Sequence, residues 1–192
     1  SRVSRAFVSS AKRGLNTTVY SELTGNRAMS DGLSVFHTNH GNLAAGENVG
    51  APDIATLSAA RLAMRTQTGL QTDDALNIEP RFLIVPAALE TSSDTVINTM
   101  EGYKADGGPG ERNPFYKKLQ LVVDPCLDKV SAAAWYLTAD PSQFDTIEVC
   151  YLDGNEVPYL EEREGWVNDC WEFKIRFAYG VKALDHRGLY RN

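Results

Sequence analysis

The amino-acid sequence predicts an α+β fold, with helices mostly in the first half of the chain and antiparallel strands mostly in the second. Two patterns support this prediction. Apolar residues recur at spacings of three and four from Val3 to Leu23, as on one face of a helix. Apolar and polar residues alternate from Trp171 to Ala178, as in a half-buried strand. A chain of 192 residues, 43% of them hydrophobic, is long enough to form an ordinary core.

The first predicted helix runs to about Leu23, where the segment 24–26, Thr-Gly-Asn, supplies a stop signal. A helix of this length spans ~30 Å, close to the width of a small domain. Its polar side carries several cations, which are Arg2, Arg5, Lys12 and Arg13. Such a side is solvated by default, and contact with another subunit is the alternative.

Strand and helix signals alternate in the middle of the chain. We expect a short strand at 33–36, and then a helix that is capped by Asp53 and ends at Gly69. The run 81–85 is apolar, β-prone and bounded by prolines, which indicates a buried strand. Pro86 then occupies the first position of a third helix. The order in this region is therefore helix, strand, helix.

The second half of the chain begins with an irregular segment, 101–114, whose glycines and prolines indicate a surface loop. Three strand-like runs follow at 118–123, 135–138 and 146–152. An antiparallel hairpin is then expected from 157–163 and 170–178.

The composition excludes several classes of protein. The formal net charge of −6 has the wrong sign for a protein whose main partner is a phosphate backbone. The sequence has neither a membrane-spanning run nor a secretory signal. Three widely spaced cysteines, Cys126, Cys150 and Cys170, are expected to be buried and reduced rather than paired.

Residues suited to catalysis or ligand binding are sparse. His37 and His40 supply at most two ligands of a metal site, and a loop with both imidazoles bonded to the backbone is the simpler interpretation. Trp135, Trp166 and Trp171 suit a core or interface better than a ligand cage. We therefore expect no catalytic residue and no cofactor. The alternatives are a metal-dependent enzyme that uses His37 and His40, and a binding module that uses the tryptophans.

The segment at 31–43 in the first quarter of the chain reads DGLSVFHTNHGNL. It resembles a stretch of the major head subunits of tailed phages related to the Mu-type head protein, which are often fused to a prohead protease. Further stretches agree in the same order: LSAARLAM at 57–64, LNIEPRFLIVP at 76–86, LVVDP at 121–125, WYLTADP at 135–141, EFKIR at 172–176 and DHRGLYRN at 185–192. The resemblance therefore covers nearly the whole chain.

The resemblance implies the tailed-phage (HK97-like) major capsid protein fold, with a long spine helix, antiparallel strands and a central α/β region. A peripheral region is expected at 1–43 and 142–179, and an axial region at 44–141 and 180–192. The implied function is that of a structural subunit, not an enzyme, of an icosahedral phage or prophage head. Its partners would be copies of itself in hexamers and pentamers. The shell would assemble in the bacterial cytoplasm and enclose DNA without reading its sequence.

Three groups of charged residues are the expected subunit contacts: Arg5, Lys12 and Arg13; Glu101, Lys104 and Asp106; and Glu161, Glu162 and Glu164. The sequence starts at Ser1 inside a helical pattern. We therefore expect it to be part of a longer protein, with an N-terminal arm, an extended loop and a scaffold or prohead protease region upstream. Without the arm and loop, we expect a monomer or a small oligomer.

Overall fold

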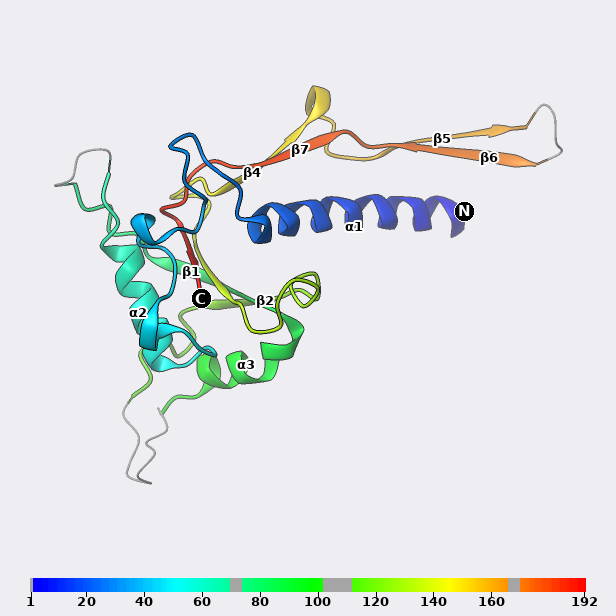
Figure 1. Ribbon diagram of the computed structural model, residues 1–192. Coiled ribbons are helices and arrows are strands. Elements are labelled where there is room, and N and C mark those ends of the chain that lie inside the picture. Colours follow the sequence, from blue (N-terminus) through cyan, green and yellow to red (C-terminus); the bar gives the residue numbers. More distant parts are fainter. Residues whose placement is uncertain (1, 70–73, 102–111, 166–169) are drawn as a thin grey trace. The chain divides into compact units, whose positions relative to one another are not determined.

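The computed structural model describes residues 2–69, 74–101, 112–165 and 170–192. The chain divides into two compact units (Figure 1). Unit 1 consists of residues 1–25 and 147–182, and unit 2 consists of residues 26–146 and 183–192. Helices and strands both occur, which confirms the α+β class.

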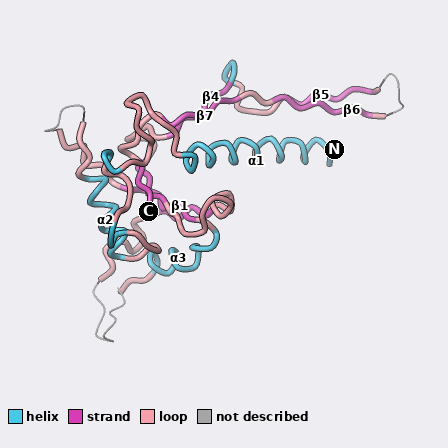
Figure 2. Tube along the Cα trace, viewed as in Figure 1, coloured by secondary structure: helices cyan, strands magenta, loops and turns pink. Residues whose placement is uncertain are grey.

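Unit 1 contains one long helix and two narrow sheets (Figure 2). The helix α1 runs over Arg2–Gly25, close to the length expected from the sequence. The first sheet pairs β4 (Ile147–Tyr151) with β7 (Tyr179–Ala183). The second is the expected antiparallel hairpin of β5 (Tyr159–Glu164) and β6 (Trp171–Arg176).

The helix α1 packs against the strands of unit 1 through small and polar residues. The Thr18 Oγ1 and Tyr179 hydroxyl oxygens lie 3.2 Å apart, and a Cβ atom at Gly14 would lie 3.6 Å from the same hydroxyl oxygen. Towards the start of the helix, Val3 and Phe7 are 43% and 37% exposed. The strands of unit 1 therefore do not bury the predicted apolar face at this end of the helix.

Unit 1 has almost no interior. Among its described residues only Glu22, Leu23 and Pro158 are buried. Two-stranded sheets are marginally stable by themselves in water. The elements of unit 1 consequently expose much of the surface that a folded domain normally buries.

Unit 2 is built on a four-stranded sheet with the order β2-β1-β3-β8. The strands are β1 (Pro80–Val85), β2 (Gln120–Val123), β3 (Tyr136–Ala139) and β8 (Leu189–Arg191). The β1–β2 pair is parallel, whereas β1–β3 and β3–β8 are antiparallel. The run that becomes β2 is predicted as a strand, but the sequence pattern gives neither its partner nor its direction. It pairs in parallel with β1 because the intervening segment, which includes a helix, returns the chain to the same end of the sheet.

Two helices accompany this sheet. The helix α2 (Ile54–Arg65) starts at a capping box, in which the Thr56 amide donates to the Asp53 carboxylate and the Asp53 amide donates to the Thr56 hydroxyl. The helix α3 covers Glu90–Asn98. Short 3-10 turns lie at Thr38–His40, Gly46–Asn48, Ala87–Leu89 and Leu152–Gly154.

The hydrophobic core lies within unit 2. The largest of its side chains is Trp135, which is fully buried and donates its indole N–H to the Gly50 carbonyl oxygen at 2.8 Å. The other members of the core come from both helices, from the sheet and from the segments that lead into β1 and β2: Leu57, Ala60, Met64, Ile78, Leu83, Val85, Ile97, Phe115, Leu119, Leu137, Ala139 and Tyr190. Unit 2 thus contains the well-packed interior that unit 1 lacks.

Several predictions from local pattern are wrong. The expected strand at 33–36 is reduced to one bridge between Ala28 and Ser34. The helix α2 ends at Arg65 rather than at Gly69, and Pro86 precedes a 3-10 turn rather than opening α3. The cysteines at 150 and 170 are exposed, not buried, although all three cysteines are free. The segments that form β7 and β8 were not identified as strands.

Candidate subunit-contact surfaces

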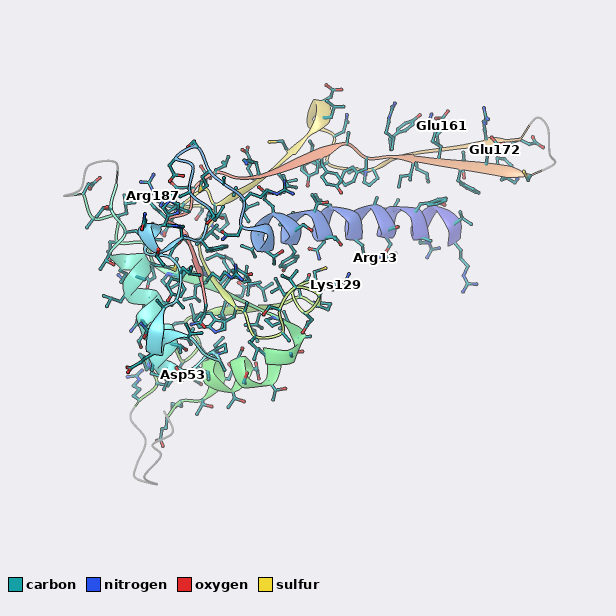
Figure 3. The ribbon with its side chains drawn as sticks, in the orientation of Figure 1. Arg13, Asp53, Lys129, Glu161, Glu172 and Arg187 are labelled. Carbon is teal, nitrogen blue, oxygen red and sulfur yellow. The ribbon has the colours of Figure 1, made fainter. Side chains whose placement is uncertain are left out.

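The predicted cations of the first helix form one exposed side of α1. Arg5, Lys12 and Arg13 line an open depression of about 640 Å³ on this side. Figure 3 shows Arg13 on the side of α1 that faces away from β5 and β6. Its guanidinium donates to the Ser9 hydroxyl at 2.9 Å. Glu22 is the only acidic residue of this helix, so its first five turns carry an uncompensated positive charge.

The predicted loop contacts are described only at the ends of the loop. Glu101 is exposed and forms an antiparallel bridge with Arg112, whereas Lys104 and Asp106 lie outside the described residues. Next to Arg112, the buried side chain of Asn113 donates to the carbonyl oxygens of Val96 and Thr99, at 2.5 and 2.9 Å. These hydrogen bonds fix the point at which the chain returns to the core.

The predicted acidic residues of the third group lie on β5 and divide between its two faces. Glu161 pairs across the hairpin with Lys174 at 3.3 Å. The neighbouring cross-strand pair on the same face is Arg163 and Glu172, at 2.7 Å. Residues directly opposite in an antiparallel pair share a face, so this face is a ladder of neutralised charges. Glu161 is therefore already paired within its own subunit, and Figure 3 shows it pointing away from α1.

The opposite face of the hairpin has a different character. Glu162 lies opposite Phe173, and Glu164 lies opposite Trp171. Both carboxylates are exposed and, in the described part of the chain, neither forms an ion pair. Trp171, the first residue of the regular alternating pattern in β6, is 65% exposed. Unit 1 therefore does not bury this tryptophan.

A second group of exposed apolar residues was not identified from the sequence. Leu152, Val157 and Tyr159 are exposed and line a hollow of about 540 Å³ within unit 1. Val157 is 73% exposed. One feature of the sequence could have predicted this group. Leu152 and Val157 lie on either side of an Asp-Gly turn, where polar residues are usual. Exposed apolar patches of this kind are typical of protein interfaces.

The two histidines of the predicted loop have separate structural roles. The His37 Nδ1 accepts the Asn39 amide at 3.1 Å and thereby caps the 3-10 turn at 38–40. The ring of His40 is buried, with Nδ1 3.2 Å from the Val35 carbonyl oxygen and Nε2 2.8 Å from the Asp31 carboxylate. Each ring is thus hydrogen-bonded to a nearby backbone group, which confirms the interpretation of His37 and His40 as structural residues of a loop.

The third histidine joins this loop from the far end of the chain. His186 stacks on His40 with 3.7 Å between ring centroids and 10° between ring planes. Burial lowers the pKa of His186, and the charge of His40 lowers it further. The hydrogen bond from His40 lowers the pKa of Asp31. The cluster of Asp31, His40 and His186 could not be predicted from the sequence, because no local pattern connects His186 to the loop at 31–43.

The described residues do not form a metal centre. Within residues 2–69, 74–101, 112–165 and 170–192, no group of three or more His, Cys, Asp or Glu side chains is placed to hold a metal ion. The geometry therefore gives no support to a metal-dependent enzyme that uses His37 and His40. A search of the same residues finds no helix of the length and apolar character needed to cross a membrane.

The tryptophans do not come together either. Trp135 lies in the core of unit 2, Trp171 lies exposed in unit 1, and Trp166 is outside the described residues. The burial of Trp135 confirms its expected role as a core residue. The surfaces left for function are therefore the exposed charged and apolar patches.

Comparison with known proteins places this arrangement in context. The chain matches the family model described as phage capsid protein, and the match covers residues 1–192. No curated protein matches the chain.

Proposed function

Because the chain belongs to the phage capsid protein family, it is a structural subunit of a phage capsid, and we propose that its copies form a closed icosahedral head of hexamers and pentamers. The observation that carries this proposal is the family match over residues 1–192. We place the subunit with the Mu-type head proteins, on the motif at 31–43. The proposal assigns the chain no catalytic role.

The small interior of unit 1 supports assembly through intersubunit packing. Burial of apolar surface is the main favourable contribution to folding, and unit 1 obtains little of it from its own described residues. Interfaces between obligate partners resemble a domain core that is divided between chains. Exposed side chains such as Val3, Phe7, Leu152, Val157 and Trp171 would be buried by neighbouring subunits.

The two units suggest how the subunit is organised in the shell. We assign the peripheral region, predicted at 1–43 and 142–179, mainly to the long helix and narrow sheets of unit 1, although residues 26–43 and 142–146 lie in unit 2. We assign the axial region, predicted at 44–141 and 180–192, to the four-stranded sheet and two helices of unit 2. An elongated region with little core suits lateral contacts, and a compact region suits the gathering of subunits around a symmetry axis.

The net charge of −6 supports a shell that contains DNA without binding it tightly. A positive net charge favours binding to many phosphates, and here acidic residues outnumber basic ones by twenty-five to nineteen. We propose that the shell encloses DNA without sequence-specific contacts. Assembly would take place in the bacterial cytoplasm with a scaffold or prohead protease as partner.

Electron microscopy of the protein expressed from its complete gene tests the proposal. The protein is produced in bacteria together with the phage's scaffold and protease genes, and particles are isolated by sedimentation and viewed by negative stain. Closed shells of uniform diameter are the expected result. Soluble subunits and no shells, with scaffold and protease present, would contradict the proposed function.

A further inference from the structure

A groove of about 380 Å³ in unit 2 is lined by cationic side chains. We call it the basic groove. Its charged residues come from α2, the start of β1, the segment before β2 and the turn after β3: Arg61, Arg81, Lys117, Lys118, Glu79 and Asp140. Four cations thus face two carboxylates, on a chain whose overall charge is negative.

Both carboxylates of the groove already have partners. Glu79 forms an ion pair with Arg65 at 3.0 Å, outside the groove. The Asp140 carboxylate accepts hydrogen bonds from the amide and the hydroxyl of Ser142, at 2.9 and 2.7 Å. These hydrogen bonds lower the pKa of Asp140, and the positive charge of Arg81 lowers it further. The groove therefore has more positive charge than its own acids neutralise.

Three cations of the groove have no acidic partner in the described part of the chain, namely Arg61, Lys117 and Lys118. Arg61 is nevertheless held in position, because its guanidinium carbon lies 4.5 Å from the centroid of the buried Phe115 ring. Lys117 has a φ of +53°, and its amide donates to the Ile97 carbonyl oxygen at 3.0 Å. A fixed guanidinium with free N–H donors is well suited to bind a carboxylate.

The complementary surface lies on the hairpin of unit 1. We call it the acidic edge, defined by Glu162, Glu164 and Trp171. The two carboxylates are alternate residues of one strand, so they lie on the same face, about 7 Å apart along the strand. The residues opposite them are Phe173 and Trp171, which do not neutralise their charge. The exposed tryptophan adds an apolar contact of the kind that dominates binding energy in interfaces.

We propose that the basic groove of one subunit binds the acidic edge of a second copy of this chain. The inference rests on the proposed self-assembly and identifies one contact by which it occurs. The contact joins two different surfaces, so each subunit offers both a groove and an edge, and a ring or shell can propagate from it. Complementary charge also selects the register of the two surfaces. The attraction between them weakens as the salt concentration rises.

Zero-length cross-linking tests the contact directly. Subunits labelled with ¹⁵N are mixed with unlabelled subunits, assembled from the complete gene product, and treated with a carbodiimide. This reagent joins a lysine amine to a carboxylate as an amide with loss of water. The expected product links Lys117 or Lys118 of one isotope to Glu162 or Glu164 of the other. Absence of such mixed-isotope links, in a sample where other intersubunit links form, would overturn the proposal.

Charge exchange gives an independent test. The groove variant carries Lys117→Glu and Lys118→Glu, and the edge variant carries Glu162→Lys and Glu164→Lys. Each alone should reduce shell yield at least tenfold, and a single chain that carries all four changes should restore it, because each edge then meets a groove of opposite charge. Matched controls with the same charge change are Lys129→Glu with Lys182→Glu, and Glu148→Lys with Glu156→Lys. These controls should assemble like the unaltered protein.

The outcomes separate this inference from the proposed function. If the unaltered protein forms shells and both variants assemble normally, the contact is wrong and the capsid function stands. If the unaltered protein forms no shells, the proposed function fails, and mixed-isotope links between soluble subunits still decide the contact. Failure of the chain with all four changes to restore assembly, with all three variants folded by circular dichroism, would also overturn the contact.

Discussion

His40 and His186 stack face to face, with 3.7 Å between their ring centroids, although they lie near opposite ends of unit 2 in the sequence. The stack joins the loop at 31–43 to the last segment of the chain. The Asn42 side-chain amide strengthens the same junction by donating to the His186 carbonyl oxygen at 3.2 Å. The segment at 31–43 is thus held against the last segment of unit 2.

This stack should make unit 2 sensitive to acid. The charged groups around His186 are His40, Asp31, Asp185 and Arg187. Burial of the His186 ring, and next the charge of His40, hold the pKa of His186 below 6.5, its ordinary value. The unfolded state therefore takes up a proton first as the pH falls. The free energy of unfolding should decrease as the pH falls below about 6.5 towards the lower pKa of the folded state. Asp31, whose folded pKa is lowered from 3.8, contributes a separate loss only below that value.

Denaturant unfolding at several pH values between about 5 and 7.5 measures this effect. The variant His186→Phe keeps an aromatic ring in the stack and removes the titrating group. Its free energy of unfolding should depend less on pH in this range than that of the unaltered protein. Identical pH dependence in the two proteins would refute the assignment to His186.

The cations of α1 should be needed for assembly but not for folding. Arg5 and Arg13 are exposed on a helix whose only acid is Glu22. Reversing both charges, with Arg5→Glu and Arg13→Glu, should lower shell yield about tenfold by weakening an electrostatic contact. The helical circular dichroism signal should be unchanged. Shell yield equal to that of the control Lys129→Glu with Lys182→Glu would show that this side of α1 makes no such contact.

The core of unit 2 should dominate the stability of the chain. Leu83 is fully buried in β1, whereas Leu62 on α2 is 63% exposed. Leu83→Ala leaves a cavity and should lower the free energy of unfolding by about 2–5 kcal/mol. Leu62→Ala should change it by less than about 0.5 kcal/mol. Chemical denaturation of both variants measures the difference, and equal losses would contradict the position of the core.

Gly188 should be required for close packing before β8. A Cβ atom there would lie 2.7 Å from Thr146 Cγ2 and 3.1 Å from Phe144 Cδ1. Gly188→Ala should therefore destabilise the protein by about 1–3 kcal/mol, through displacement of these side chains. At Gly180 nothing lies within 4 Å of an added Cβ atom. Gly180→Ala is the control, and a thermal midpoint as low as that of Gly188→Ala would contradict the packing argument.

Local sequence signals predicted the elements that depend on neighbouring residues. The Asp53 cap, the length of α1 and the β5–β6 hairpin follow from short-range hydrogen bonds and periodicity, and the structure confirms all three. The candidate contact residues stay predictions, because no partner subunit is present to test them. Their exposure in α1 and β5 is what the sequence indicated.

The α+β class, the main helices and the family can be predicted from the sequence, because periodicity, caps and collinear motifs are local properties of the chain. Which distant segments meet is visible only in the folded structure. It paired β2 in parallel with β1, brought β8 to the edge of the sheet and stacked His186 on His40. It also placed Glu161 in an internal ion pair and left Glu162 and Glu164 free of one among the described residues. Strand pairing and charge pairing depend on contacts between residues far apart in the chain, and no short-range pattern encodes these contacts.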